Sequence, residues 1–240
     1  AYFDGELKKL STKDANPAYL SISGMKNFYT DYANIEVAEI IIFDSGSTDE
    51  TLQICKLYTD KIWQTDWPGY GKQKQRALEQ TTCDWVLSID ADEVVTEKLR
   101  QEIQQAIQKN DCNGYKLIRD LVFHGKRIRF ANATNKILRL VRRDKAYFTN
   151  DMVHESLVVD GSIEILKGVL LHYSLSSATE MLKKMNYYTD ISAQQKLKKG
   201  KRGGVWCGVL KALWMFFRVY VLNGGFMDGR AGLVLAVGFA

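Results

Sequence analysis

Short apolar runs alternate with amphipathic stretches through the first 175 residues of the chain. Two of these runs, Val37–Phe43 and Trp85–Ile89, are continuous, as in strands that are buried on both faces of a sheet. Helix patterns follow over Lys72–Gln80 and from Thr96 onward. Further strands are expected at Lys61–Trp63, Tyr115–Ile118, Ile137–Val141 and Ile163–Leu171. The alternation predicts an α/β fold with a doubly wound, Rossmann-like sheet.

The remainder of the chain, residues 176–240, has a different pattern. Val205–Leu222 is strongly apolar and aromatic, but Lys211 and Arg218 interrupt it, which argues against a helix that crosses a bilayer. The segment fits either a helix that lies at a membrane interface or a helix that packs on the main domain. We therefore expect two domains, residues 1–175 and a helical region over 176–240.

Charge is spread unevenly along the chain, whose net charge is +5. Residues 176–240 contain ten Lys and Arg against three acidic residues, and several of the basic residues form the run Lys196–Arg202. A basic segment beside an aromatic one suits an anionic membrane surface, and we expect that partner rather than nucleic acid. The four cysteines are far apart without a C-x-x-C pair, and the first residues show no apolar run typical of a signal peptide.

Acidic residues follow the run Trp85–Ile89 directly, in the sequence D-A-D-E that begins at Asp90. Ligands of doubly wound sheets bind at the carboxyl ends of strands, where Asp90 and Asp92 would lie. Two carboxylates one residue apart can bind a divalent cation, Mg²⁺ or Mn²⁺. The alternative is that these acids only cap the helix that follows.

Two more segments are candidates for binding a nucleotide. Asp44 ends the strand that begins at Val37, and the small residue Ser45 follows it, which would let a nucleoside approach. The helix after Gly69 begins with free backbone N–H groups, and Lys72 and Lys74 lie in its first turns, as suits a diphosphate. A simple turn at Asp44 and a solvated basic face on the helix are the alternatives.

In their order and spacing, the segments DSGSTDET, GYGKQKQRAL and DWVLSIDADE resemble family 2 glycosyltransferases of the GT-A fold. Later segments are similar to the lipopolysaccharide core-biosynthesis β-glucosyltransferases: VHE at Val153–Glu155, LLHYS at Leu170–Ser174, MLKKMNYYT at Met181–Thr189 and GFMDGRAG at Gly225–Gly232. The resemblance extends from about Glu39 to the C-terminus.

The resemblance implies roles for individual residues. Asp44 would contact the nucleoside, Asp90 would lie near the ribose, and Asp92 would bind the metal. The residues expected to contact the nucleotide sugar are Asp44, Ser45, Lys72, Lys74, Asp90 and Ala91. His172 is a second candidate for the metal or the phosphates, and Glu155 is the candidate base, with Asp151 as the alternative.

The activity that the resemblance implies is a metal-dependent, inverting transfer of a hexose. We expect glucose from UDP-glucose as the donor and the inner-core heptose of lipopolysaccharide as the acceptor. The expected location is the cytoplasm, peripherally at the bacterial inner membrane, where a lipid-linked glycan acceptor would be found. Alternatives are a polyprenyl-phosphate or other cell-surface glycan acceptor, and a non-catalytic module that binds a nucleotide sugar. A nucleotidyltransferase would show a loop rich in glycine and arginine near its N-terminus, which this sequence lacks.

The segment before Glu39 departs from the family pattern. Tyr19–Ser23 is a poor strand by sequence, and Lys26-Asn27 lacks the acidic residue that follows in relatives. We therefore name no site residue in this segment.

Overall fold

The computed structural model describes residues 19–23, 39–90, 92–131, 133–149, 156–175 and 204–240, together with scattered positions from 179 to 200. The chain divides into two compact units. The first unit is made of Ala1–Ile118 and Lys136–Leu170, and the second of Arg119–Asn135 and Leu171–Ala240. The second unit thus joins a segment from the middle of the chain to the C-terminal region.

The elements follow one another in this order: β1 (Tyr19–Ser23), β2 (Glu39–Asp44), α1 (Thr51–Lys56), β3 (Ile62–Gln64), α2 (Tyr70–Gln80), β4 (Trp85–Asp90), β5 (Glu93–Val95), α3 (Glu97–Lys109), β6 (Gly114–Phe123), β7 (Lys126–Arg127), β8 (Thr134–Arg142), η1 (Arg143–Lys145), β9 (Ala146–Phe148), β10 (Leu157–Val159), β11 (Ile163–Leu175), α5 (Val205–Phe217), η2 (Arg218–Leu222), η3 (Gly225–Asp228) and α6 (Arg230–Phe239). Each strand and helix expected between Val37 and Leu171 is found, with its bounds shifted by a few residues. The predicted α/β class is confirmed.

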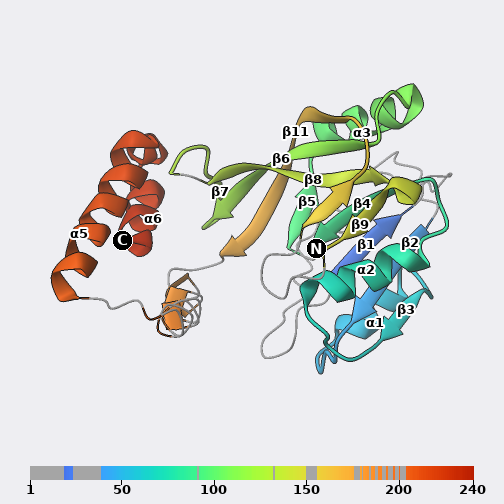
Figure 1. Cartoon of the computed structure of the whole chain (residues 1–240), viewed down its shortest axis with the longest axis horizontal. Helices are drawn as coiled ribbons and strands as arrows, with labels where there is room; N and C mark the ends of the chain where they lie inside the picture. The colour runs from blue at the N-terminus through green and yellow to red at the C-terminus, as the bar shows by residue number, and fades with distance from the viewer. Residues whose placement is uncertain are drawn as a thin grey trace. The chain divides into compact units, whose positions relative to one another are not determined.

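The main sheet has the strand order β3-β2-β1-β4-β8-β6-β11-β5, and β7 pairs with β6 (Figure 1). β2 and β3 are parallel, whereas β1 runs antiparallel to both β2 and β4, and β8 runs antiparallel to β4. The sheet is therefore mixed, unlike a purely parallel doubly wound sheet. Because β2 and β4 both oppose β1, they run in the same direction, and their carboxyl ends lie at the same edge of the sheet.

The expectation that Tyr19–Ser23 is a poor strand is wrong. The segment forms β1 in the interior of the sheet, where Tyr19 lies opposite Phe43 on one side and opposite Asp90 on the other. A strand that is hydrogen-bonded on both sides gains its stability from its neighbours, so its own sequence can carry a weak strand pattern.

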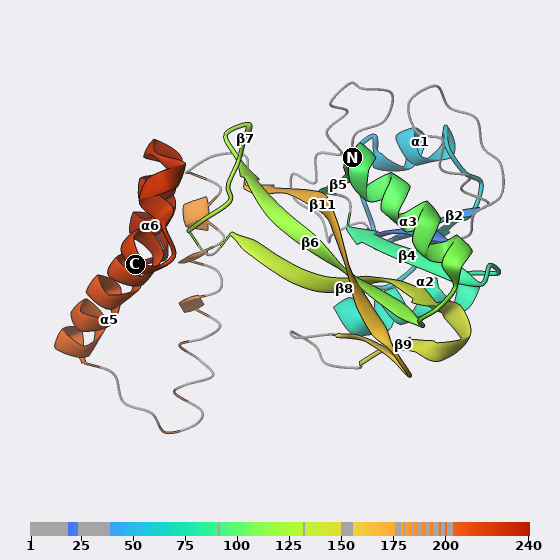
Figure 2. The same cartoon turned by 90° about the horizontal axis from the view of Figure 1, so that it is seen from above.

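The two faces of β4 carry different layers of the first unit. Trp85, Leu87 and Ile89 pack with the buried face of α3, whereas Val86, on the opposite face, packs with Leu78 of α2. Figures 1 and 2 show α3 and α2 on opposite sides of β4. Successive side chains of a strand alternate between faces, so the side chain at position 90 belongs to the face that carries α2.

The second unit has a core of its own. Leu121 and Phe123 of β6 pack there with Val219 of η2 and Leu235 of α6. A Cβ atom on Gly232 would lie 1.8 Å from the carbonyl oxygen of Gly225, so α6 lies directly against the backbone of η3. Only glycine allows this approach, which gives the last glycine of the G-F-M-D-G-R-A-G segment a structural reason.

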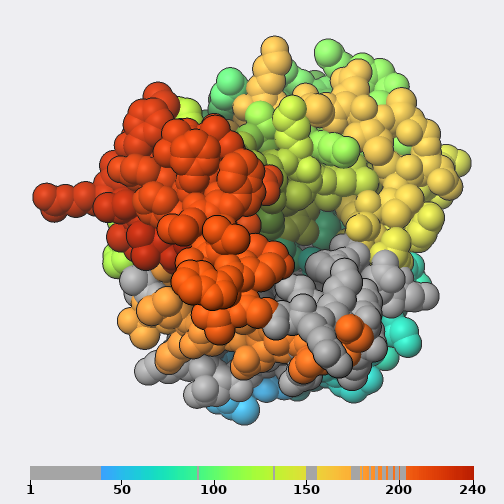
Figure 3. Space-filling view, turned by 60° about the vertical axis from the view of Figure 1, so that its left-hand side comes forward, coloured from blue at the N-terminus to red at the C-terminus, as the bar shows by residue number. Residues whose placement is uncertain are grey.

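The helix predicted over Val205–Leu222 is confirmed as α5 and η2. Among the described residues it is the one helix that is long and apolar enough to cross a membrane, with a mean hydropathy of 1.6 over 18 residues. Only 6% of that stretch is buried, and Trp206 and Trp214 are 81% and 57% exposed. In Figure 3, α5 and α6 form the orange-to-red surface. Most of the apolar surface of α5 is therefore not packed in a core.

Candidate functional site

Asp44, the last residue of β2, is fully buried and organises the loop that follows it. Its carboxylate accepts hydrogen bonds from the backbone N–H groups of Gly46, at 3.0 Å, and Ser47, at 3.1 Å, and also from the Ser47 hydroxyl. Gly46 has a φ of 101°, a conformation that favours glycine. The carboxylate therefore fixes the shape of the loop at the edge of the sheet, and its contact with a nucleoside stays a prediction.

Gln73 of α2 connects two loops at this edge and was not identified from the sequence. Its side-chain amide nitrogen lies 2.9 Å from Ser45 Oγ and 3.0 Å from Thr65 Oγ1, and the residue is completely buried. The loop after β2 and the loop after β3 are thus tied to the same helix. The link fixes Ser45, one of the residues expected to contact the nucleotide.

Asp90, at the end of β4, lies in a network of charged side chains. The carboxylate of Asp90 forms ion pairs with Lys74, whose Nζ lies 3.1 Å from Oδ1, and with Arg139 Nη2. The same Nη2 lies 2.7 Å from Glu93 Oε1, and Glu93 Oε2 accepts a hydrogen bond of 3.0 Å from the backbone N–H of Asp90. Four side chains from α2, β4, β5 and β8 therefore converge on the start of the D-x-D segment.

The network controls the ionisation of Asp90. Burial alone would raise the pKa of Asp90, but the charges of Arg139 and Lys74 outweigh it and hold the pKa well below its usual range. Burial likewise opposes the charge of Arg139, and its two carboxylate neighbours, Asp90 and Glu93, raise its pKa above the ordinary value. Asp90 is therefore a carboxylate at neutral pH.

The two lysines of the expected diphosphate site lie on different sides of α2. Lys74 is buried and faces Asp90, whereas Lys72 is exposed. Residues two apart on a helix point in nearly opposite directions, which explains the difference. The structure places Lys74 against Asp90, and contact of the exposed Lys72 with a diphosphate stays a prediction.

The remaining candidates are described to different degrees. Asp92 is half-buried in the turn between β4 and β5. His172 is half-buried on β11, in the part of that strand that belongs to the second unit, and its contact with a metal stays a prediction. Ala91, Asp151 and Glu155 lie outside the described residues.

The donor set around Asp92 fits Mg²⁺ or Mn²⁺. Asp92 is half-buried and offers a carboxylate, and the charge of neighbouring Asp90 is balanced by Arg139 and Lys74. Mg²⁺ is usually bound through one or two carboxylates, and waters and substrate phosphates complete its shell. One carboxylate at this edge, together with a bound diphosphate, satisfies that requirement.

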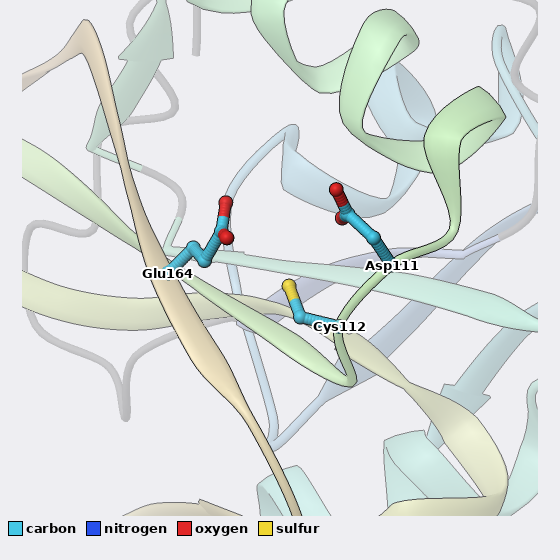
Figure 4. A group of neighbouring side chains, drawn as sticks. All are labelled: Asp111, Cys112 and Glu164. Atoms are coloured by element: carbon cyan, nitrogen blue, oxygen red, sulfur yellow. The ribbon is translucent and has the colours of Figure 1, made fainter.

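A second group of possible metal ligands lies elsewhere in the first unit (Figure 4). The ligand atoms of Asp111, Cys112 and Glu164 lie within 4.8 Å of one another. Asp111 accepts a hydrogen bond from Tyr115, which packs against Trp85 at the first residue of β4. Asp90 ends the same strand, so this group lies at the opposite edge of the sheet, about 15 Å or more away at the rise of a strand. We assign it no part in the site.

The chain is similar to known proteins over most of its length. The model of glycosyl transferase family 2 matches residues 17–159. The lipopolysaccharide core biosynthesis glycosyltransferase LpsC of Rhizobium meliloti is 34% identical over 209 residues, which is 83% of this chain and 77% of LpsC. The uncharacterized glycosyltransferase RT0209 of Rickettsia typhi is 30% identical over 217 residues, 84% of this chain and 74% of that protein.

Among solved structures, the chain is similar to residues 1–349 of TarS from S. aureus. The structure of that protein in complex with UDP-GlcNAc covers 82% of this chain and 79% of its own, with 14% sequence identity and a TM-score of 0.41. The structure of its complex with UDP gives 16% identity and a TM-score of 0.40.

Proposed function

The chain belongs to glycosyltransferase family 2, and on that basis we propose that it is an inverting enzyme that transfers glucose from UDP-glucose to the inner-core heptose of lipopolysaccharide. The family membership agrees with the resemblance and with the GT-A fold class expected from the sequence. One observation carries the finer proposal: LpsC, whose name assigns it to lipopolysaccharide core biosynthesis, is 34% identical across 83% of this chain.

The carboxyl edge of β2 and β4 would bind the nucleotide part of the donor. One strand, β1, separates Asp44 from Asp90, so the two lie about 10 Å apart at the spacing of neighbouring strands. In this proposal the loop after Asp44 contacts the nucleoside, Asp90 lies at the ribose, and Lys74 stays paired with Asp90. The proposal is supported by the convergence of these side chains at one edge of the sheet.

Asp92 would hold the divalent cation, and a part for His172 in binding metal or phosphate stays a separate prediction. When bound, the cation neutralises negative charge on the departing diphosphate, so no acid is needed to protonate the leaving group. The residues that line this edge bind and orient the donor. Glu155 takes the proton of the acceptor hydroxyl as its oxygen forms a bond to the anomeric carbon, while the bond from that carbon to the diphosphate oxygen breaks.

The acceptor would be presented at the inner face of the bacterial inner membrane. α5 exposes tryptophan and leucine side chains, Lys211 lies among them, and Arg218 follows as the first residue of η2. Aromatic side chains suit the headgroup region of a bilayer, and basic ones are attracted to anionic lipids. In this proposal α5 lies in the membrane interface and holds the enzyme near its lipid-anchored acceptor.

The experiment is to measure UDP release from UDP-glucose by the purified chain, with and without Mn²⁺ and with a heptose-containing core acceptor. We expect release that requires both the metal and the acceptor and that falls at least about a hundredfold in Asp92→Ala. The matched control is Asp111→Asn, which removes an acid at the opposite edge of the sheet. Its release should equal that of the wild type.

Each other outcome would change a different part of the proposal. Release with UDP-galactose but not UDP-glucose would replace the sugar. Release with a polyprenyl-phosphate acceptor but not with the core acceptor would replace the acceptor. Loss of the metal-dependent release in Asp111→Asn, with Asp92→Ala unaffected, would move the metal to the group of Asp111, Cys112 and Glu164. Nucleotide binding without release under any condition would indicate a binding module.

The base is tested separately. Glu155→Gln should lower kcat about 10²- to 10⁴-fold, the usual contribution of a general base, while the affinity for UDP stays unchanged. Asp151→Asn should retain most of its turnover. Near-normal turnover in Glu155→Gln together with loss in Asp151→Asn would assign the role to Asp151.

A further inference from the structure

We propose that Glu93 and Arg139 are positioning residues that hold the D-x-D turn in the shape in which Asp92 binds its metal. This inference rests on the proposed function, because it concerns the same turn. Glu93 ends the D-A-D-E segment, Arg139 has no distinctive sequence pattern, and neither is expected to touch the donor. Their part follows from the contacts that they make on both sides of Asp92.

Glu93 closes the turn from its C-terminal side. Glu93 is the first residue of β5 and is 5% exposed, and its Oε2 accepts a hydrogen bond of 3.0 Å from the backbone N–H of Asp90, three positions earlier. The carboxylate therefore spans the turn from its last residue to its first. Asp92 lies between the two residues that this hydrogen bond joins, so the bond restrains the segment that carries Asp92.

Arg139 fixes the same carboxylate from the neighbouring strand. The register of β4 with β8 pairs Leu87 with Leu140, so the next step places Arg139 opposite Ser88. Asp90 is then the diagonal neighbour of Arg139 on the same face, about 7–8 Å away, which an arginine side chain can span. Its Nη2 reaches both Asp90 and Glu93, the latter at 2.7 Å from Oε1.

The charges make Arg139 necessary to this arrangement. The carboxylates of Asp90 and Glu93 both contact one guanidinium nitrogen. Without a cation between them, the two carboxylates would repel each other. Lys74 contacts Asp90 on its other oxygen, Oδ1. Arg139 is thus the cation that joins the two ends of the turn.

Stability alone does not account for the choice of arginine. Among the described residues, Arg139 Nε is a buried donor that has no hydrogen-bond partner. Asp90 Oδ1 is also buried and without a hydrogen-bond partner, although it forms an ion pair with Lys74. A buried donor without a partner costs free energy. A network that keeps such a group is expected where the position of a neighbouring functional residue matters more than stability.

The test uses Mn²⁺ and UDP as probes, with affinities measured by calorimetric titration on the full chain. In Glu93→Gln and Arg139→Met, we expect Mn²⁺ affinity at saturating UDP to fall about 10- to 100-fold, the usual effect of removing the partners of a metal ligand. UDP affinity without metal should change little. Arg139→Lys, which keeps the charge, should restore part of the loss.

The matched control is Arg127→Met. Arg127 pairs with the buried carboxylate of Asp120 in the second unit, so this variant also removes a cation from a buried acid. Its Mn²⁺ affinity should equal that of the wild type. Thermal unfolding of each variant identifies any that does not fold. Glu93→Gln keeps the size of the side chain and removes the charge that pairs with Arg139, so it serves if Arg139→Met does not fold.

Hydrogen exchange of the segment Trp85–Val95 provides a readout that does not depend on the donor. Exchange of this segment should be faster in Glu93→Gln and Arg139→Met than in the wild type, and unchanged in Arg127→Met. Wild-type Mn²⁺ affinity and unchanged exchange in the folded variants would overturn the inference. If the wild type does not bind Mn²⁺ with UDP, the proposed donor and metal fail, and hydrogen exchange alone decides whether Glu93 and Arg139 hold the turn.

Discussion

The usual distribution, with apolar side chains inside and charged ones outside, is reversed in two regions of the molecule: the carboxyl end of β4 and the surface of α5. At the end of β4, charged groups that are normally solvated are buried: Arg139 is 7% exposed and Glu93 is 5% exposed. Along α5, side chains that are normally buried are exposed, including Leu210 at 67%. Each inversion costs free energy, because buried charges lose hydration and exposed apolar surface orders water.

The comparison separates two kinds of cost. Buried charges are tolerated when each has partners in fixed positions, as Asp90, Glu93 and Arg139 have. Exposed apolar surface is tolerated when a membrane or another protein covers it in the functional state. A site for chemistry and a surface for docking are therefore expected to respond differently to substitution: the first should lose stability, and the second should lose binding alone.

The largest effect on stability is expected for Arg139→Met. The substitution leaves two buried carboxylates without their shared cation, and removal of one member of a buried ion pair costs about 3–5 kcal/mol. The free energy of unfolding from urea denaturation measures it. The control is Arg76→Met, because the pair of Arg76 with Asp66 is exposed and should contribute less than about 1 kcal/mol. Equal losses in both variants would show that the network is not effectively buried.

The sequence predicted the position of this network better than its members. Asp90 and Asp92 were identified because they follow a continuous apolar strand, a local pattern. Arg139 is 49 positions from Asp90 and Gln73 is 28 positions from Ser45, so their partners follow only from strand register and helix packing. The sequence of β8 shows Arg139 as one of several basic residues, with no mark of its burial.

The fold, like the network, could be predicted where a local sequence pattern exists. The strands with apolar runs and the helix α3, where Thr96 Oγ1 accepts a hydrogen bond from Leu99 N, agree with their sequence patterns. β1 does not, because this five-residue segment gains its strand structure from the strands that pair with it on both sides. α6 lies within the helical region expected over residues 176–240, but its packing against the backbone of Gly225 becomes visible only in three dimensions.

For the exposed apolar surface of α5, we expect a double substitution, Trp206→Ser with Trp214→Ser, to reduce binding to anionic vesicles. Each of the two side chains should account for about a tenfold loss of affinity. Insertion of a large aromatic side chain is worth about 1.5–3 kcal/mol, and both residues are more than half exposed. The free energy of unfolding should stay within about 0.5 kcal/mol of the wild type. Vesicle co-sedimentation and urea denaturation measure the two effects.

The control for α5 is Leu235→Ala, which truncates a fully buried side chain of the same unit. It should cost about 2–5 kcal/mol of stability, because it opens a cavity in a packed core. Vesicle binding by the folded fraction should be unchanged. A large loss of stability in the tryptophan variant would mean that the two side chains pack in a core, and it would remove the case for a membrane partner.

A smaller effect is expected from acid. The folded pKa of Asp90 lies below its unfolded value of about 3.9, since Arg139 and Lys74 outweigh burial. The stability that this difference contributes is therefore fully present above about pH 5 and is lost as the pH falls through 4 and below. In Asp90→Asn, the part of the acid-induced loss that belongs to Asp90, on the order of 1–3 kcal/mol, should be missing.

Urea denaturation of both proteins between pH 7 and pH 3 makes this measurement. The pKa of Asp49 is also lowered, by hydrogen bonds from Thr51, so the variant Asp49→Asn provides a comparison with an acid outside the network. That variant should keep most of the wild-type slope. If the free energy of unfolding fell equally with pH in the wild type and in Asp90→Asn, the ionisation of Asp90 would contribute nothing to the acid-induced loss of stability.

The smallest effect is expected for the charges on α5. Lys211→Gln should weaken binding to anionic vesicles by about 1 kcal/mol, roughly fivefold, because a basic residue near an anionic surface contributes about that much. Added salt should reduce the difference between the variant and the wild type, since screening acts on exposed charges. Binding to neutral vesicles should be equal for both proteins, because the tryptophan and leucine side chains are unchanged. If the variant loses as much affinity for neutral vesicles as for anionic ones, Lys211 acts through the structure of α5 rather than through its charge.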